Sequence, residues 1–170
     1  LSYRLIFCEI VTALTVQKLG GHFVCKLFDT FNLSSVKLLY FLSCFYDELY
    51  LNKPLTSRPA NSEKYIVAKG FRGINLEYLS NLHNLINIWG KYEYPNDVTD
   101  IFSDNIPDYF VRLINDYNKS NSKQQIVTIN KTINIINETS KLSFLNTIIE
   151  QQIKAAQSWC EKYKEKINMK

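Results

Sequence analysis

The spacing of apolar residues changes near Gly73, and this change limits the folds open to the chain. Before Gly73, helical spacing alternates with short apolar runs, whereas after it only helical spacing recurs. Alternating helices and short strands are typical of α/β layer proteins. We therefore expect an α/β region over residues 1–73 and an all-helical extension over residues 74–170. The first region holds too few strands for a complete doubly wound sheet, so we expect part of one.

In the α/β region the expected order is helix, strand, helix, strand, strand. Glycines and turn residues punctuate these elements, as they do at helix ends and strand ends. The first helix is expected to end at the glycine pair Gly20-Gly21, and the last strand at Gly70. The expected ranges are a helix over 5–19, a fully buried strand over 23–28, a helix over 36–46 after N-cap candidates at 32–35, and strands over 48–52 and 65–68.

The extension is expected to contain three helices. Their ranges are 76–88, a helix that starts at Ile106-Pro107-Asp108 and runs through Tyr117, and 142–167. Residues 126–136 are rich in β-branched side chains, which suit a helix or a strand. No residue of the extension forms a pattern whose chemistry can be argued.

Composition and charge exclude several classes of protein. Apolar residues make up 46% of the 170 positions and charged residues 21%, which is typical of a globular chain. The net charge is +4, and all of it lies before Leu76, where nine Lys and Arg stand against five Asp and Glu. This excess is compatible with an anionic partner but does not require one. The longest apolar stretch, Leu38 to Tyr46, is far shorter than the ~20 residues of a membrane helix, so no membrane partner is expected.

Cysteine and histidine do not form a metal pattern. The four cysteines include no C-x-x-C pair, and the two histidines lie near no paired cysteine. We expect buried free thiols and no metal site. The chain also begins at Leu1, inside an expected helix, which indicates a piece of a longer protein.

Two polar features stand out in the α/β region. Lys26 interrupts the apolar run of the first strand, although lysine is rarely buried without a partner. It marks either a ligand site at a strand end or a lysine that extends to solvent. The loop Lys53 to Tyr65 gathers cations, hydroxyls and one carboxylate, and it is either a site or a solvated surface loop. Lys37, Lys64 and Lys69 are expected to be ordinary surface charges.

The sequence around these features resembles a known family. The run GGHFVCKLFD (20–29) and the run from Lys53 to Gly70, which contains TSRPANSEKY, resemble the last motifs of the FtsJ/RrmJ-like RNA 2′-O-ribose methyltransferases. Within that superfamily the second run is similar to the cap-specific mRNA 2′-O-methyltransferases. The resemblance covers about residues 1–73. It implies that this region is the C-terminal half of a Rossmann-like methyltransferase sheet whose final strand runs antiparallel to the others.

The resemblance also implies a Lys-Asp-Lys-Glu tetrad that methylates a ribose 2′-hydroxyl with S-adenosylmethionine. Lys26 matches the second lysine and Glu63 the glutamate, and we expect the two side chains to share one site. The first lysine, the aspartate and the Gly-rich cofactor loop belong to segments that would precede Leu1. Gly20-Gly21 cannot replace that loop, because it follows a helix and precedes a strand. The 170 residues alone are therefore expected to bind no cofactor and to be inactive.

Five polar residues are expected to contact RNA. Arginine offers a fork for phosphate, lysine a point charge, and small polar side chains can hydrogen-bond ribose. These residues are Lys53, Ser57, Arg58, Asn61 and Ser62.

The implied partner is capped mRNA or another RNA, with the transcription or capping machinery as a further partner. The implied compartment is the nucleus for a cellular protein, or the cytoplasm or viral factory for a large DNA virus. The alternatives are an rRNA 2′-O-methyltransferase, an inactive relative that binds RNA or a capping complex, and a helical interaction protein with a vestigial α/β part.

Overall fold

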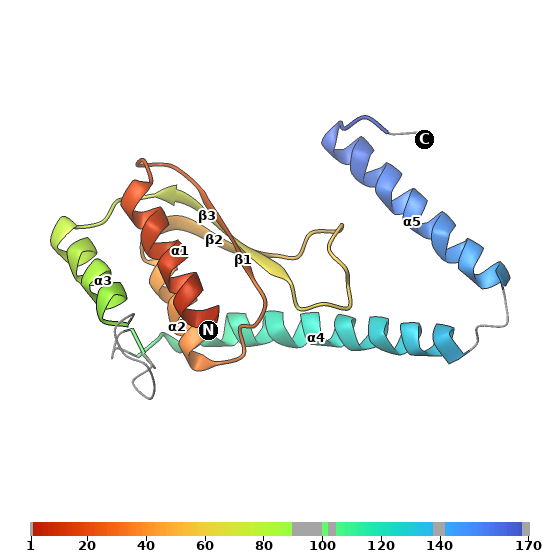
Figure 1. Cartoon of the computed structure of the whole chain (residues 1–170), viewed down its shortest axis with the longest axis horizontal. Helices are drawn as coiled ribbons and strands as arrows, with labels where there is room; N and C mark the ends of the chain where they lie inside the picture. Colours follow the sequence, from red (N-terminus) through yellow and green to blue (C-terminus); the bar gives the residue numbers. More distant parts are fainter. Residues whose placement is uncertain (1, 90–99, 102–104, 138–141, 168–170) are drawn as a thin grey trace. The chain divides into compact units, whose positions relative to one another are not determined.

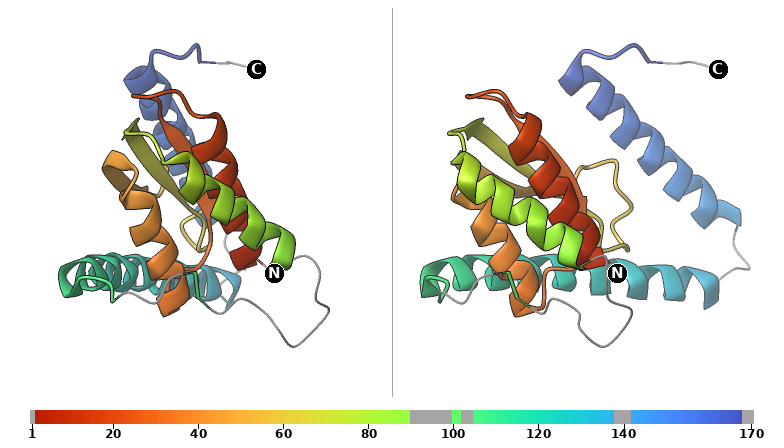
Figure 2. Two further views of the ribbon diagram at one scale, coloured as in Figure 1. Left: turned by 90° about the vertical axis from the view of Figure 1, so that its left-hand side faces the viewer. Right: turned by 60° about the vertical axis from the view of Figure 1, so that its left-hand side comes forward.

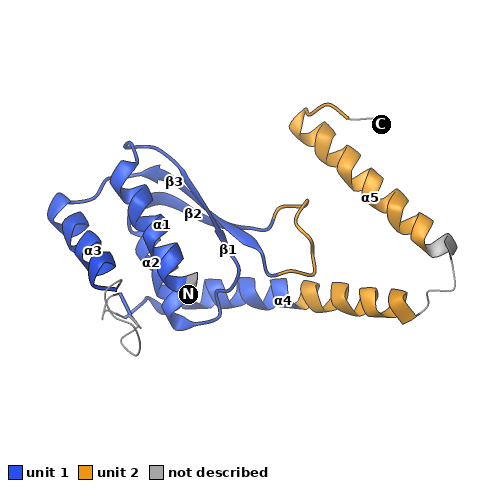
Figure 3. Cartoon of the chain, in the orientation of Figure 1, with its two compact units in different colours: residues 1–53, 62–122 blue, residues 54–61, 123–170 orange. Residues whose placement is uncertain are grey.

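The computed structural model describes residues 2–89, 100–101, 105–137 and 142–167. Within these residues the chain is a mixed α/β protein with one three-stranded antiparallel sheet and five helices (Figure 1). The chain divides into two compact units, which Figure 3 colours separately. Unit 1 comprises residues 1–53 and 62–122, and unit 2 comprises residues 54–61 and 123–170.

The sheet of unit 1 has the order β1-β3-β2. Its strands are β1 (Phe23–Leu27), β2 (Tyr46–Asn52) and β3 (Lys64–Phe71). Both outer strands pair antiparallel with β3, so β1 and β2 run in the same direction on either side of it. The predicted directions are therefore confirmed: the last strand is the one that reverses.

Successive side chains of each strand point to opposite faces of the sheet, and one of these faces is buried. Cys25 and Leu27 of β1 and Ile66 and Ala68 of β3 are buried on this face. The expectation that β1 is fully buried is wrong. Val24 and Lys26 point to the other face, where Val24 is 58% exposed. Strand β1 is covered on the face that α1 contacts, and its other residues are exposed or partly exposed.

Two helices pack on the buried face, namely α1 (Ser2–Val16) and α2 (Leu33–Ser43). Helix α1 contacts β1, helix α2 contacts β2, and the two helices contact each other. Phe7 of α1 is fully buried, and its ring lies 6.5 Å from that of Phe41 on α2. Such close-packed aromatic and aliphatic side chains form the core that holds the sheet in place.

The glycine pair has a different role from the expected helix cap. Helix α1 ends at Val16, three residues earlier than expected, and Gly20 follows with φ +74 in the turn before β1. The Gly20 N–H donates to the Phe71 carbonyl at 2.8 Å, and the Phe71 N–H donates to the Gly21 carbonyl at 3.0 Å. These two bonds join the start of β1 to the end of β3.

Strand β3 is also longer than expected, because Gly70 does not end it. Gly70 has φ +71, and a side chain there would clash with the Asp47 carboxylate. Only glycine adopts this conformation without strain, so the strand continues to Phe71. Helix α2 begins after Asn32, which is one of the N-cap candidates.

The packing of unit 1 continues past Gly73. Helix α3 (Leu76–Trp89) contacts α1, and the Trp89 ring lies 5.6 Å from that of Phe7. Figure 2 shows α3 beside α1 in both views. Buried Asn118 of helix α4 (Asp108–Asn137) exchanges two hydrogen bonds with Thr30: its amide donates to the Thr30 carbonyl, and its side-chain oxygen accepts from the Thr30 hydroxyl. The division into domains 1–73 and 74–170 stays a prediction.

Unit 2 contains the second part of α4, helix α5 (Leu142–Tyr163) and a short loop. Residues 126–136 continue α4, which resolves their ambiguous pattern in favour of a helix. Helix α5 ends four residues before the expected Ile167, and Lys164 then has φ 56. No helix among the described residues combines the length and apolar character that crossing a bilayer requires.

The thiols are free, but they are less uniformly buried than expected. Cys25 is buried and donates to the Glu9 carboxylate at 3.0 Å. Burial, together with that bond, raises the pKa of Cys25 to about 12, so the thiol stays protonated. Cys44, by contrast, is exposed.

Candidate active site

Lys26 and Glu63 form an ion pair at the end of β1. The Lys26 Nζ lies 2.9 Å from the Glu63 Oε2. The sheet register explains this contact. Lys26 is paired with Tyr65 of β3, and Glu63 lies two residues before Tyr65, near the end of β1. The structure therefore brings together the two side chains that the sequence assigned to one site.

Three groups stabilise the negative charge of Glu63. Lys26 donates to one carboxylate oxygen, and the Tyr65 hydroxyl donates to the other at 3.1 Å. The hydrogen bond from Lys26 is the main cause that lowers the pKa of Glu63, with smaller contributions from Tyr65 and the charge of Lys53. Glu63 is therefore charged at neutral pH, and the ion pair is lost only as the pH falls through this lowered pKa.

Lys53 lies beside the same carboxylate. Its Nζ donates to the Glu63 backbone carbonyl at 2.8 Å. Burial lowers the pKa of Lys53, and the neighbouring Glu63 charge acts in the opposite direction. A second cation at the Lys26–Glu63 pair gives this end of the sheet a local positive charge, which suits a phosphate group.

Lys26 is more accessible than its position in an apolar run suggests. Its side chain is 47% exposed, because residue 26 faces the open side of the sheet. Its Nζ also lies 5.2 Å from the centre of the Phe28 ring, which is within the range of a cation–π contact. The strand itself therefore does not desolvate Lys26.

Two lysines expected at the surface are buried. Lys64 is 2% exposed, and its Nζ donates to the Phe28 carbonyl, so it holds the loop that follows β1. Burial lowers the pKa of Lys64, opposed by the charge of Asp29. Lys37 is likewise buried and pairs with Asp100. The alternation Lys64-x-Ile66-x-Ala68 is the signal that could have placed Lys64 on the inner face. Lys69 is at the surface as expected.

The remaining loop residues divide between the two units. Ser62 is half-buried in unit 1, next to Glu63. Ser57, Arg58 and Asn61 belong to unit 2, where Arg58 is exposed and its carbonyl accepts from the Asn61 N–H at 3.2 Å. The Ser57 N–H donates to the Pro54 carbonyl at 3.0 Å, so both ends of this loop are tight turns.

The backbone N–H groups of Gly20-Gly21 are bonded within the protein. A phosphate- or nucleotide-binding glycine loop leaves backbone N–H groups free for the ligand. Here the Gly20 N–H is bonded to Phe71 and the Gly21 N–H to Lys18 at 2.9 Å. The glycine pair is therefore explained by the turn before β1. The described residues also hold no group of three metal-ligating side chains.

Comparison with known proteins gives a family for the N-terminal part. Residues 1–71 match the FtsJ-like methyltransferase family. The chain is 49% identical over 90 residues to cap-specific mRNA (nucleoside-2′-O-)-methyltransferase 1 of Mus musculus, covering 51% of this chain and 11% of that protein. It is 50% identical over 72 residues to the protein of the same name from Homo sapiens, covering 42% and 9%.

The similarity reaches beyond the family match. The Caenorhabditis briggsae cap-specific mRNA (nucleoside-2′-O-)-methyltransferase 1A is 35% identical over 138 residues, which cover 77% of this chain and 16% of that protein. A share of that size must include residues after position 71. The chain thus spans between 9% and 16% of the length of these three relatives. Over residues 1–71 the chain thus matches the FtsJ-like methyltransferase domain, and its similarity to the cap-specific methyltransferases covers a small part of their length.

Proposed function

We infer that the chain is part of an S-adenosylmethionine-dependent RNA methyltransferase that methylates a ribose 2′-hydroxyl at the cap-proximal nucleotide of mRNA. The observation that carries this inference is the 2.9 Å pair between Lys26 and Glu63, which are the residues that match the family's second lysine and glutamate. The names and identities of the relatives support the cap-specific branch. In this proposal the three strands are the C-terminal part of a Rossmann-like sheet, with β3 as its reversed strand.

The proposed division of labour follows from charge. The methyl group would come from S-adenosylmethionine when it is bound, outside the residues described. Lys26 accepts the proton of the 2′-hydroxyl, and Glu63 holds the resulting ammonium in position. A lysine accepts a proton only as a neutral amine, and half-exposed Lys26 is not desolvated by its own strand. Covering of Lys26 by RNA and by the rest of the methyltransferase domain would supply that desolvation.

Five residues are proposed to position the RNA. Lys53 already lies beside Glu63 and would neutralise a phosphate next to the reacting ribose. Ser62 would hydrogen-bond the same nucleotide. Ser57, Arg58 and Asn61 lie on the exposed loop, where Arg58 would contact phosphate. A cap methyltransferase of cellular transcripts would act in the nucleus, together with the transcription or capping machinery.

The proposed reaction is tested with the full-length protein, radiolabelled S-adenosylmethionine and matched RNAs. We expect label transfer to a capped RNA whose first nucleotide carries a 2′-hydroxyl. We expect none when the first nucleotide is a 2′-deoxynucleotide. Uncapped RNA and an rRNA fragment should react much more slowly. Equal transfer to the rRNA fragment would favour the rRNA alternative, and tight binding of capped RNA without transfer would favour an inactive binding relative.

Arg58→Ala should weaken RNA binding and change turnover little at saturating RNA. Loss of one phosphate contact reduces the slope of log affinity against log salt by about 0.7–0.9. Fluorescence anisotropy at salt concentrations from about 50 to about 200 mM gives the RNA affinity and its salt slope for both proteins. Lys119→Ala, a lysine on α4, is the matched control. An unchanged salt slope for Arg58→Ala would remove Arg58 from the RNA contact.

A further inference from the structure

The loop that carries three of the proposed RNA-binding residues is held by helix α4. This loop, residues 54–61, belongs to unit 2 together with residues 123–170, whereas β2 before it and β3 after it belong to unit 1 (Figure 3). Inside unit 2 the Gln125 Nε2 donates to the Ala60 carbonyl at 3.0 Å. A side chain of the helical extension therefore fixes a loop that connects two strands of the sheet.

The surface of α4 around Gln125 indicates that this contact is polar. The next two side chains, Ile126 and Val127, are 57% and 62% exposed, whereas Gln125 is partly buried. At this point the helix leaves apolar side chains in solvent and covers an amide. Such a pattern is the reverse of ordinary apolar burial, and a hydrogen bond to the covering segment explains it.

The hydrogen bond from Gln125 reaches the middle of a tight turn. In this turn the Asn61 N–H donates to the Arg58 carbonyl at 3.2 Å. Pro59 occupies the second position, where its fixed φ angle suits the turn, and Ala60 occupies the third. Because the turn is short and stiffened by proline, one bond to Ala60 orients the backbone of exposed Arg58 as well. A ligand of Arg58 then orders less of the loop when it binds.

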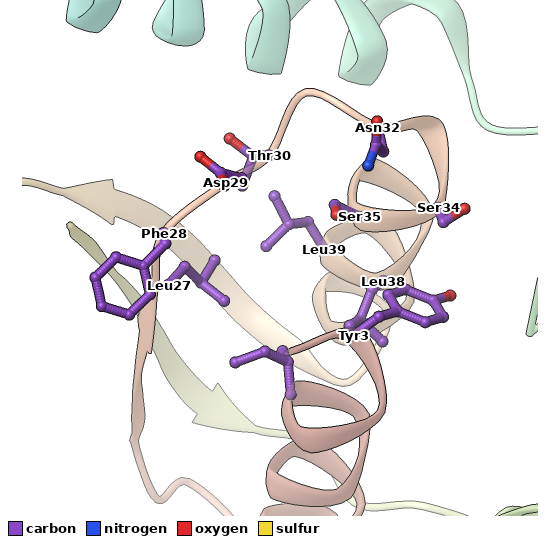
Figure 4. Close-up of a pocket in the computed structure, with 11 residues that line it drawn as sticks. Tyr3, Leu27, Phe28, Asp29, Thr30, Asn32, Ser34, Ser35, Leu38 and Leu39 are labelled. Atoms are coloured by element: carbon purple, nitrogen blue, oxygen red, sulfur yellow. The ribbon is translucent and has the colours of Figure 1, made fainter. Parts of the chain in front are cut away.

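The same helix holds a second loop with the same chemistry. Within unit 1 the Asn118 amide donates to the Thr30 carbonyl at 2.8 Å. Thr30 lies in the loop after β1, and Figure 4 shows it with Asp29 at the edge of the cavity that both residues line. Asn118 and Gln125 are seven positions apart in α4, about two helical turns, and so lie on one face of the helix. Each uses a side-chain amide to bind a loop carbonyl.

We propose that Gln125 positions the turn Arg58–Asn61 for RNA and that α4 thereby takes part in RNA binding. This proposal rests on the proposed function, in which Arg58 contacts a phosphate. It gives a role to the helical extension, whose sequence carries no motif of its own. Gln125 is a positioning residue here, because it acts on RNA through the turn that carries Arg58.

Hydrogen exchange of the full-length protein tests the contact without RNA or activity. The Ser57 and Asn61 N–H groups are both bonded in turns of the loop, so their exchange reports how often the loop opens. Gln125→Ala should speed exchange in peptides that cover residues 54–61 severalfold. Gln124→Ala, the same change at the exposed neighbouring position, should leave it unchanged. Wild-type exchange in Gln125→Ala would overturn the proposal.

RNA affinity tests whether the contact serves binding. Gln125→Ala should weaken RNA binding about two- to tenfold, the effect of one neutral hydrogen bond, with turnover at saturating RNA and the affinity for S-adenosylmethionine little changed. In an Arg58→Ala background Gln125→Ala should cause no further loss, because its effect passes through Arg58. Gln124→Ala should have no effect in either background. A loss of the same size with and without Arg58 would overturn the proposal.

Gln125→Glu separates the hydrogen bond from the shape of the side chain. Glutamate has nearly the same shape, but its carboxylate cannot donate to the Ala60 carbonyl. It should therefore speed exchange of residues 54–61 as Gln125→Ala does, and Gln124→Glu controls for the added charge. Wild-type exchange in Gln125→Glu would show that the amide donor is not what holds the loop, and the proposal would be wrong.

The two measurements also separate this proposal from the proposed function. If no RNA is methylated while the exchange pattern and the dependence on Arg58 both hold, Gln125 positions an RNA-binding loop and the enzymatic proposal has failed. If RNA is methylated but Gln125→Ala exchanges and binds RNA like the wild-type protein, the positioning proposal has failed alone.

Discussion

Lys26→Ala in the full-length protein should lower the rate of 2′-O-methylation by ~10²–10⁴-fold and leave the affinity for S-adenosylmethionine nearly unchanged. The reason is that Lys26 acts on the hydroxyl and its proton, an interaction that strengthens in the transition state. The contact of 2.9 Å with the Glu63 carboxylate fixes the position of the Lys26 Nζ. Single-turnover kinetics with saturating RNA give the rate, and calorimetry gives the cofactor affinity.

Lys26→Arg is the sharper control for this prediction. Arginine keeps a positive charge beside Glu63 but stays protonated near neutral pH, so it cannot accept the proton. We expect it to be nearly as slow as Lys26→Ala. Near-normal turnover of Lys26→Arg would show that Lys26 acts by charge alone, and the proton-acceptor mechanism would then be wrong even if the reaction is correct.

Phe7→Ala should destabilise unit 1 by about 3–5 kcal/mol, the usual cost of removing a fully buried phenylalanine ring. Phe7 is 0% exposed and touches the rings of Phe41 on α2 and Trp89 on α3. Its loss therefore leaves a cavity at the point where three helices meet. Phe7→Leu keeps most of the volume and should cost less than about 1.5 kcal/mol.

The measurement uses tryptophan fluorescence during urea unfolding. The sequence has two tryptophans, and Trp159 lies in unit 2, so a Trp159→Phe background leaves Trp89 as the reporter for unit 1. Trp89 is 8% exposed and becomes solvated when α3 detaches. If Phe7→Ala unfolds at the wild-type urea concentration, α3 does not depend on this core, and the packing past Gly73 contributes little to stability.

The sequence predicted the kinds and order of the elements in the α/β region better than their limits. Helical spacing and short apolar runs identified both helices and all three strands there, because those patterns arise from local geometry. The direction of β3 came from the resemblance alone. The ends at Gly20 and Gly70 were misjudged, since each glycine accommodates a contact between β1, β2 and β3 that local spacing does not contain.

For the site, the sequence identified the pair but misjudged its surroundings. Lys26 and Glu63 lie 37 positions apart, and only the motif resemblance joined them before the sheet register did so. The exposure of Lys26 and the burial of Lys64 both depend on which way each strand faces. A strand that turns one face to solvent reverses the environment of every second residue, so an apolar run with one lysine could not predict either result.

The hydrogen bonds between Thr30 and Asn118 can form only late in synthesis of the chain. The two residues are 88 positions apart, so Thr30 leaves the ribosome roughly 4–18 s before its partner at ~5–20 residues per second. During that interval the loop after β1 lacks the contact that buries its threonine. A nascent chain that stops before α4 lacks Asn118, so it cannot form the two hydrogen bonds that hold Thr30 in the loop after β1.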